Sequence, residues 1–136
     1  MGYGMAGNVR TKMPASGTLF IHDVIRQVCD RFMDEFGHLG RIQIVDSPKE
    51  GLDQSNTLIS IVPRGDNVRQ VYLEGAGAVV NTSKADRLIL ECSTIEVQTT
   101  RDVGDQVAKA GVGHYFDAPV SVSLIEPAPP HGTSGL

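Results

Sequence analysis

Short apolar runs alternate with longer amphipathic runs along this chain, and this alternation constrains its fold more than any other feature. Runs with the length of strands occur at 18–21, 41–45, 58–62, 88–90 and 115–118. The segments between them carry apolar residues at helical spacing. Strands that alternate with helices predict an α/β protein with a mostly parallel sheet. The mostly apolar runs 58–62 and 88–90 are typical of strands covered on both faces.

The first long helical pattern has four apolar residues, each four positions after the last, with Gly37 predicted at its C-terminal cap. A shorter helix is predicted over 68–72. The four residues of the first pattern are Val24, Val28, Phe32 and Phe36.

The segment Ser93-Thr94-Ile95-Glu96 has the spacing of a capping box, with a hydroxyl followed three residues later by a carboxylate. We therefore expect Ser93 to cap a helix that carries Val103 and Val107 and ends at Gly111.

Composition narrows the class of protein. The chain has 136 residues, of which 40% are hydrophobic, so it has room for one domain with a core and not for two. A net charge of −4 without a basic run argues against nucleic-acid binding. No segment approaches the length of a membrane span, and the start lacks the apolar stretch of a signal peptide. These features predict a cytoplasmic protein, or a mitochondrial one if the full-length protein has a transit peptide that is missing here.

Metal and disulfide sites have little support. Cys29 and Cys92 are too few for a disulfide framework or a zinc site, and we interpret both as buried thiols. The four histidines are scattered without the spacing of metal ligands, so no metal site is predicted.

The chain begins with closely spaced glycines. Gly2, Gly4 and Gly7 spell the G-x-G-x-x-G of a dinucleotide-binding turn, but that turn needs a preceding strand and none precedes it here. Read in a second register, residues 1–8 (MGYGMAGN) resemble the end of the fingerprint of the β-hydroxyacid dehydrogenases, the superfamily of 3-hydroxyisobutyrate and 6-phosphogluconate dehydrogenases. That register places Met5 and Asn8 within the first helix of the family.

Three further segments carry the resemblance, in the family's order. Residues 61–63 (IVP) look like the family's strand that ends in Leu-Pro, and 91–96 (ECSTIE) are similar to its Asp-x-Ser-Thr-Ile-Asp motif. Residues 117–121 (DAPVS) match the start of Asp-Ala-Pro-Val-Ser-Gly-Gly, after which the resemblance stops.

The resemblance implies a Rossmann-like, doubly wound, mostly parallel sheet that lacks its first strand. Residues 1–121 are then a partial NAD(P)-binding domain, truncated at both ends relative to the family. Residues 122–136 are a proline-rich tail outside the family pattern, which we expect to be flexible.

The resemblance also implies site residues. Asp23 matches the carboxylate that accepts hydrogen bonds from the adenosine ribose, which favours NAD over NADP, while Arg26 nearby softens this preference. From the residues alone, a simple N-cap for the helix that follows is the favoured role of Asp23, and with the resemblance the cofactor role leads. Ser121 matches the residue that anchors the substrate carboxylate. The predicted cofactor-binding residues are Gly2, Asp23, Val62, Pro63, Asn67 and Thr94.

No catalytic residue is predicted. The general acid/base of the family is a lysine beyond the matched region, and no lysine of this chain matches it, so we expect no appreciable dehydrogenase activity from the isolated chain. The lysines are Lys12, Lys49, Lys84 and Lys109.

Together these features favour the NAD(P)-binding part of an oxidoreductase similar to 3-hydroxyisobutyrate dehydrogenase. Its expected partners are the dinucleotide and, in the intact enzyme, a small 3-hydroxy acid. Neither nucleic acid nor membrane is expected, and the oligomeric state stays open. The alternatives are a non-catalytic nucleotide-binding or regulatory module and a non-functional fragment from an altered gene model or splice.

Overall fold

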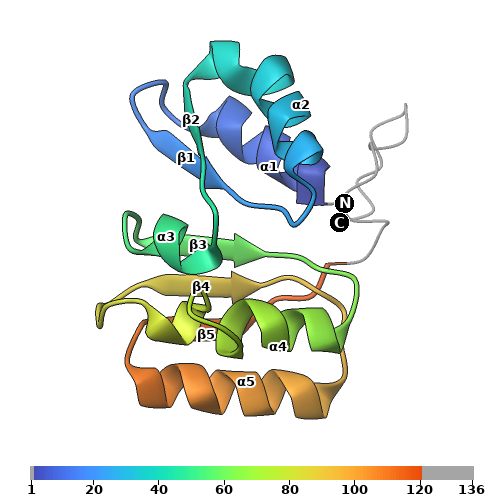
Figure 1. Cartoon of the computed structure of the whole chain (residues 1–136), viewed down its shortest axis with the longest axis vertical. Helices are drawn as coiled ribbons and strands as arrows, with labels where there is room; N and C mark the ends of the chain where they lie inside the picture. Colours follow the sequence, from blue (N-terminus) through green and yellow to red (C-terminus); the bar gives the residue numbers. More distant parts are fainter. Residues whose placement is uncertain (1, 121–136) are drawn as a thin grey trace, which may run out of the picture.

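The computed structural model describes residues 2–120, and the tail predicted at 122–136 lies outside them. Helices and strands alternate as the sequence pattern predicts (Figure 1). The helices are α1 (Gly2–Lys12), α2 (Arg26–Phe36), α3 (Pro48–Leu52), α4 (Gly65–Leu73) and α5 (Val97–Ala110), with 3-10 turns η1 (Gly37–Leu39) and η2 (Val79–Asn81). The strands are β1 (Thr18–Ile21), β2 (Arg41–Ile44), β3 (Thr57–Ser60), β4 (Leu88–Glu91) and β5 (His114–Asp117).

The strands form two parallel sheets. β1 pairs with β2, and β4 lies between β3 and β5. In a doubly wound sheet of order 3-2-1-4-5-6, removing the central first strand leaves strands 3-2 on one side and 4-5-6 on the other. The observed pairs have this order, so the prediction of a doubly wound sheet lacking its first strand is confirmed, and within residues 2–120 no strand joins the two sheets.

The amino-terminal unit, residues 2–44, consists of β1, β2, α1 and α2. Its helices pack through aromatic side chains, with the ring of Phe32 5.3 Å from that of Tyr3 and 4.7 Å from that of Phe36. Phe32 and Cys29 are buried. A Cβ at Gly7 would lie 2.6 Å from Phe36 Cζ, so the glycine lets the ring lie directly against α1.

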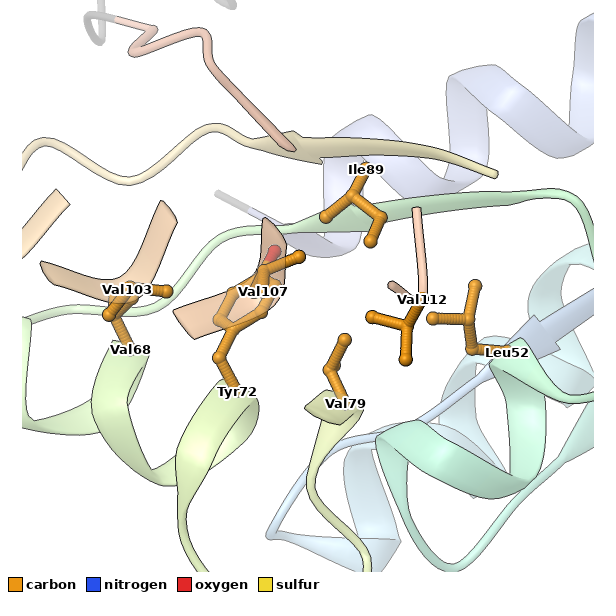
Figure 2. Packing of buried hydrophobic residues seen from close by; sticks show 8 residues of the cluster. All are labelled: Leu52, Val68, Tyr72, Val79, Ile89, Val103, Val107 and Val112. Carbon is orange, nitrogen blue, oxygen red and sulfur yellow. The ribbon is translucent and has the colours of Figure 1, made fainter. Parts of the chain in front are cut away.

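The carboxyl-terminal unit, residues 57–117, contains the larger core. Helices α4 and α5 lie on one face of the β3–β4–β5 sheet, and their buried side chains form one cluster with others from β4, η2, the loop before β5 and the end of α3 (Figure 2). The buried members are Leu52, Val68, Tyr72, Val79, Ile89, Val103, Val107 and Val112.

The opposite face of that sheet is open, which corrects the expectation that β3 and β4 are covered on both faces. Ile59 pairs with Leu90, and Leu90 pairs with Phe116, so these three side chains form a row across this face. Ile59 is 41% exposed and Phe116 is 52% exposed. The cause is that α4 and α5 both pack on the other face.

Each unit holds a buried arginine at the amino ends of its strands. The Arg10 guanidinium donates to the carbonyls of Pro14 (2.6 Å), Gly17 (2.7 Å) and Arg41 (2.8 Å). Arg87 donates to the carbonyl of Ser83 at 2.5 Å and to those of two other loop residues, Ser55 and Val112. Carbonyl oxygens thus replace the water that a buried cation loses.

One boundary prediction is confirmed and one is wrong. Gly37 is the C-cap of α2, as predicted, with its N–H bonded to the carbonyl of Met33 and a right-handed φ of −61°, and the chain continues into η1. Ser93 does not cap α5, which begins at Val97 after Glu96 with no side-chain cap. The Ser93 hydroxyl accepts a hydrogen bond from another strand end instead. Gly111 ends α5 with φ 69°, as predicted.

No helix in the described range is long and apolar enough to cross a membrane.

Candidate functional site

The carboxyl ends of both sheets face the same side of the molecule. Arg10, near the end of α1, donates to the carbonyl of Gly17 just before β1, so the end of α1 lies beside the start of β1. The start of α1 therefore lies towards the carboxyl end of β1. Its first residue, Gly2, lies against Ile61, which directly follows β3. Ligands of open α/β sheets bind outside the carboxyl ends of the strands. Four predicted residues, Asp23, Val62, Pro63 and Thr94, lie in loops on this side.

Gly2 allows α1 to begin directly beside β3. A Cβ at Gly2 would lie 2.8 Å from Ile61 Cγ2, closer than real Cβ contacts come. The first turn of α1 contains no acidic side chain, so its backbone amides present a partial positive charge. A helix N-terminus of this kind suits a phosphate group.

The three early glycines all lie within α1. Gly2, Gly4 and Gly7 therefore do not form a dinucleotide-binding loop of their own, and the literal reading of the G-x-G-x-x-G spacing is wrong. The structure has Met5 and Asn8 in the first helix, as the second register predicts.

The loops after β3 and β4 are joined to each other. The backbone N–H of Val62 donates to Ser93 Oγ at 2.7 Å, and the N–H of Cys92 donates to the carbonyl of Ser60 at 2.8 Å. Thr94 follows Ser93 directly and is exposed, with its hydroxyl 3.4 Å from the carbonyl of Val120. Val62 and Thr94 thus belong to adjoining loops.

Beneath these loops lies a buried polar chain that the sequence analysis missed. Glu91 is fully buried, and its Oε1 accepts the N–H of Ser93 at 2.7 Å. Its Oε2 accepts the Ser60 hydroxyl, whose oxygen lies 2.5 Å from Tyr72 Oη. Burial, with the Glu91 charge second, raises the pKa of Tyr72 well above its usual value. The available signal was a carboxylate that ends an apolar run.

Asp23 occupies a separate part of this side. It is exposed, and its Oδ1 accepts the N–H of Ile25 at 2.8 Å while Ile25, not Asp23, is the N-cap of α2. Asp23 borders an open hollow of about 210 Å³ at the ends of β1 and β2. The hollow is lined by His22, Asp23, Val24, Arg26, Ile44, Val45 and Asp46.

The charges around this hollow are mixed. Arg26 lies 3.5 Å from Asp46 and 3.6 Å from Asp30, so its cation is shared between two carboxylates. His22 Nδ1 lies 3.1 Å from the carbonyl of Val45. Asp23 and Arg26 are predicted from the sequence, whereas His22 and Asp46 are not, although both follow the end of a strand.

The remaining predicted residues are less closely connected. Asn67 lies in the first turn of α4, where its N–H donates to Asp66 Oδ1 at 3.1 Å and its side-chain amide lies 3.4 Å from Gln70. Pro63 is exposed in the loop before α4. Among residues 2–120 no hydrogen bond or ion pair joins Asp23 to these loops. Ser121 lies outside the described residues.

The two cysteines are buried, as interpreted from sequence, and burial raises the pKa of both thiols. Within the described range no three histidine, cysteine, aspartate or glutamate side chains gather in a group that could hold a metal ion.

Parallel strands in this order, a helix that starts beside the end of β3 and a carboxylate just after β1 define a doubly wound dinucleotide-binding fold. The comparison with protein families agrees. The chain belongs to the family described as the NAD binding domain of 6-phosphogluconate dehydrogenase, whose model matches residues 1–124.

The curated relatives that the chain matches are 3-hydroxyisobutyrate dehydrogenases. The chain is 31% identical over 123 residues to the mitochondrial 3-hydroxyisobutyrate dehydrogenase of Mus musculus and 29% identical to that of Bos taurus. Each alignment covers 89% of this chain but only 35% and 34% of the relative. The chain therefore spans about a third of the length of these relatives.

Solved structures share the fold. A 3-hydroxyisobutyrate dehydrogenase of Mycobacterium tuberculosis superposes with a TM-score of 0.67 at 24% identity, over 89% of this chain and 37% of that one. A protein named Psf3, solved in complex with NADP+ and 2-OPP, gives 0.72 at 17% identity, over 89% of this chain and 39% of that one.

Proposed function

We propose that this chain binds a nicotinamide dinucleotide across the carboxyl ends of its strands, through Gly2, Asp23 and the loops after β3 and β4. The observation that carries the proposal is the close approach of Gly2 to Ile61. It sets the amides of the first turn of α1 beside the β3 loop, with the Ile61 side chain packed directly against Gly2. The residues present fit the cofactor, because phosphate-binding amides and a ribose-binding carboxylate both lie on this side.

Each residue has a distinct part in the proposal. The α1 amides hold the pyrophosphate, and Asp23 accepts hydrogen bonds from the adenosine ribose. Val62, Pro63 and Asn67 line the path between them and the nicotinamide. The exposed Thr94 hydroxyl lies beside the nicotinamide ring. When bound, the nicotinamide supplies hydride transfer.

NAD is the proposed form. Asp23 and Asp46 are both carboxylates at the hollow, and a 2′-phosphate would be repelled by each of them. Arg26 is the cation that would oppose this repulsion, but it is already paired with Asp46 and Asp30. The NADP+ in the Psf3 structure shows that the fold also accepts the phosphorylated form in that protein.

Titration of the full chain with NADH and with NADPH, followed by nicotinamide fluorescence, tests both statements. We expect saturable binding that is tighter for NADH. Asp23→Asn should weaken NADH binding about tenfold, as loss of a charge-assisted hydrogen bond does. It should also reduce the preference for NADH over NADPH. Asp105→Asn, the same change on the exposed surface of α5, is the control and should alter neither the affinity for NADH nor the preference over NADPH. Absence of saturable binding to both dinucleotides would overturn the proposal.

We further propose that a longer enzyme built on this domain exchanges a hydride with a small 3-hydroxy acid, with Ser121 holding the substrate carboxylate. This rests on the relatives, which are 3-hydroxyisobutyrate dehydrogenases. Formation of NADH from 3-hydroxyisobutyrate by the enzyme, lost in Ser121→Ala, is the expected result. Unchanged activity in that variant would exclude the role of Ser121.

A binding module without turnover is the second candidate, because of where the described lysines lie. Lys12 and Lys109 end α1 and α5, on the side away from the site, and Lys84 packs near Gly111 on that same side. Lys49 is ion-paired with Asp53 at 2.6 Å. Dinucleotide binding by this chain with no NADH formation supports the module, and steady NADH formation by this chain excludes it.

A further inference from the structure

One buried side chain is bonded to both strand ends that lead into the loops after β3 and β4. Glu91 is the last residue of β4 and is fully buried, with β3 on one side and β5 on the other. A buried carboxylate is costly unless its oxygens find donors. Here the two oxygens have different donors, the Ser93 N–H at 2.7 Å and the Ser60 hydroxyl.

The donors come from two strand ends. Ser60 is the last residue of β3, and Ser93 is two residues beyond β4. The Ser60 hydroxyl proton is directed to Glu91, so Tyr72 Oη, 2.5 Å away, donates to the Ser60 oxygen. The carboxylate thereby orders a chain of donors that runs from α4 through β3 to the β4 loop.

The same carboxylate sets the position of Ser93. With its N–H held by Glu91, the Ser93 hydroxyl accepts the Val62 N–H at 2.7 Å. The loop after β3 is thus attached to the loop after β4 at a point beyond the last strand pair. Thr94 follows directly in the chain. The two loops proposed to meet the nicotinamide half of the cofactor are therefore joined through Glu91 and Ser93.

We propose that Glu91 is a positioning residue of the dinucleotide site, which fixes the loops of Val62 and Thr94 relative to each other without touching the ligand. The proposal rests on the proposed function for its ligand. Its structural half, the joining of the two loops, stands on the hydrogen bonds alone. Glutamine at this position keeps the size but removes the charge. With its single acceptor oxygen on the Ser93 N–H, its Nε2 faces Ser60, whose hydroxyl must then turn to accept, so both charge-assisted hydrogen bonds are lost.

The test compares Glu91→Gln with three variants of the full chain. Glu74→Gln makes the same change at an exposed site after α4. Ile89→Ala lowers stability within the same strand without touching the loops. Ser93→Ala removes the acceptor of Val62 and leaves Glu91 in place, so it serves if Glu91→Gln does not fold. The readouts are amide hydrogen exchange at Val62 and Ser93 and the Kd for NADH.

We expect Glu91→Gln to speed exchange at Val62 and Ser93 at least about tenfold, since a buried charge-assisted hydrogen bond is lost, and to raise the Kd by about as much. Ser93→Ala should speed exchange at Val62. Glu74→Gln should change neither readout, and Ile89→Ala should leave the Kd of the folded protein unchanged.

Unchanged exchange at Val62 and Ser93 in Glu91→Gln overturns the joining of the loops. Faster exchange with an unchanged Kd overturns the positioning role. A rise in Kd in Ile89→Ala equal to that in Glu91→Gln also overturns it, because lost stability alone would then explain both. If the unaltered chain binds no dinucleotide, the proposed function and the positioning role fail together, and exchange still decides whether Glu91 joins the loops.

Discussion

The two units of the molecule are built on the same plan but hold together differently. The carboxyl-terminal unit, residues 57–117, has three strands and most of an eight-residue core (Figure 2). The amino-terminal unit, residues 2–44, has two strands and relies on aromatic packing between α1 and α2. Buried apolar area is the main source of stability, so most of it belongs to the carboxyl-terminal unit.

The two buried arginines sharpen this contrast. Arg87 is bonded to loops that lead into all three strands of its sheet, whereas Arg10 joins the end of α1 to the starts of β1 and β2. A buried arginine thus holds the strand starts in both units, and the units differ in how much apolar side-chain packing stands beside it. The difference teaches that the same hydrogen-bonded arrangement accompanies a large core in one unit and a small aromatic one in the other.

The largest expected effect is in the core of the carboxyl-terminal unit. Ile89→Ala should lower the free energy of unfolding by about 2–5 kcal/mol, because the side chain is fully buried and its loss leaves a cavity. Leu88→Ala, one residue away but 41% exposed, is the matched control and should cost clearly less. Urea unfolding followed by circular dichroism measures both, and equal losses would contradict the concentration of stability in this core.

An intermediate effect is expected in the amino-terminal unit. Gly7→Ala places a Cβ 2.6 Å from Phe36 Cζ, so the aromatic packing must shift at a cost of about 1–3 kcal/mol. Gly4→Ala lies in the same helix with no atom within 4 Å, and it should instead stabilise by about 0.5–1 kcal/mol through helix propensity. Thermal unfolding of the two variants measures these effects. Destabilisation by both variants would contradict the prediction that the close contact with Phe36 is the cause.

The smallest effect near neutral pH concerns Tyr72. Burial raises its pKa well above 10, so the folded state keeps the phenol neutral while the unfolded chain ionises. The resulting stability is complete below about pH 10 and falls as the pH rises above that value. Tyr72→Phe should make this alkaline loss shallower. Tyr3→Phe, in the other unit, should change it less because Tyr3 is partly exposed. Urea unfolding between pH 8 and pH 11 tests the difference.

Much of the fold could be predicted from local pattern. The apolar runs locate the five described strands to within a residue or two, because the length and the side-chain alternation of a strand depend on residues adjacent in sequence. Helix α3 was missed because five residues show no apolar face. Its signal lay in Ser47 and Pro48, since the Glu50 N–H donates to Ser47 Oγ at 3.1 Å.

The site was less predictable because its contacts are not local. The spacing of Ser93 and Glu96 predicts a capping box, yet the Ser93 hydroxyl accepts the N–H of Val62, which lies 31 residues earlier. The pairing of Ser60 with Glu91 depends on the register of β3 and β4, which no local pattern gives. Residues that follow strand ends, such as Asp23, could be placed because parallel strands end on one side of a sheet.

The separation of the two sheets has a consequence for how copies of this chain meet. Charged side chains on an edge strand hinder the addition of another strand, and the outer strands carry them, with Arg41 on β2 and Asp117 on β5. Strands β1 and β3, each paired on one side only within residues 2–120, carry none. Self-association by strand addition would therefore begin at the edges of β1 and β3, which no strand joins within residues 2–120, and not at the outer strands.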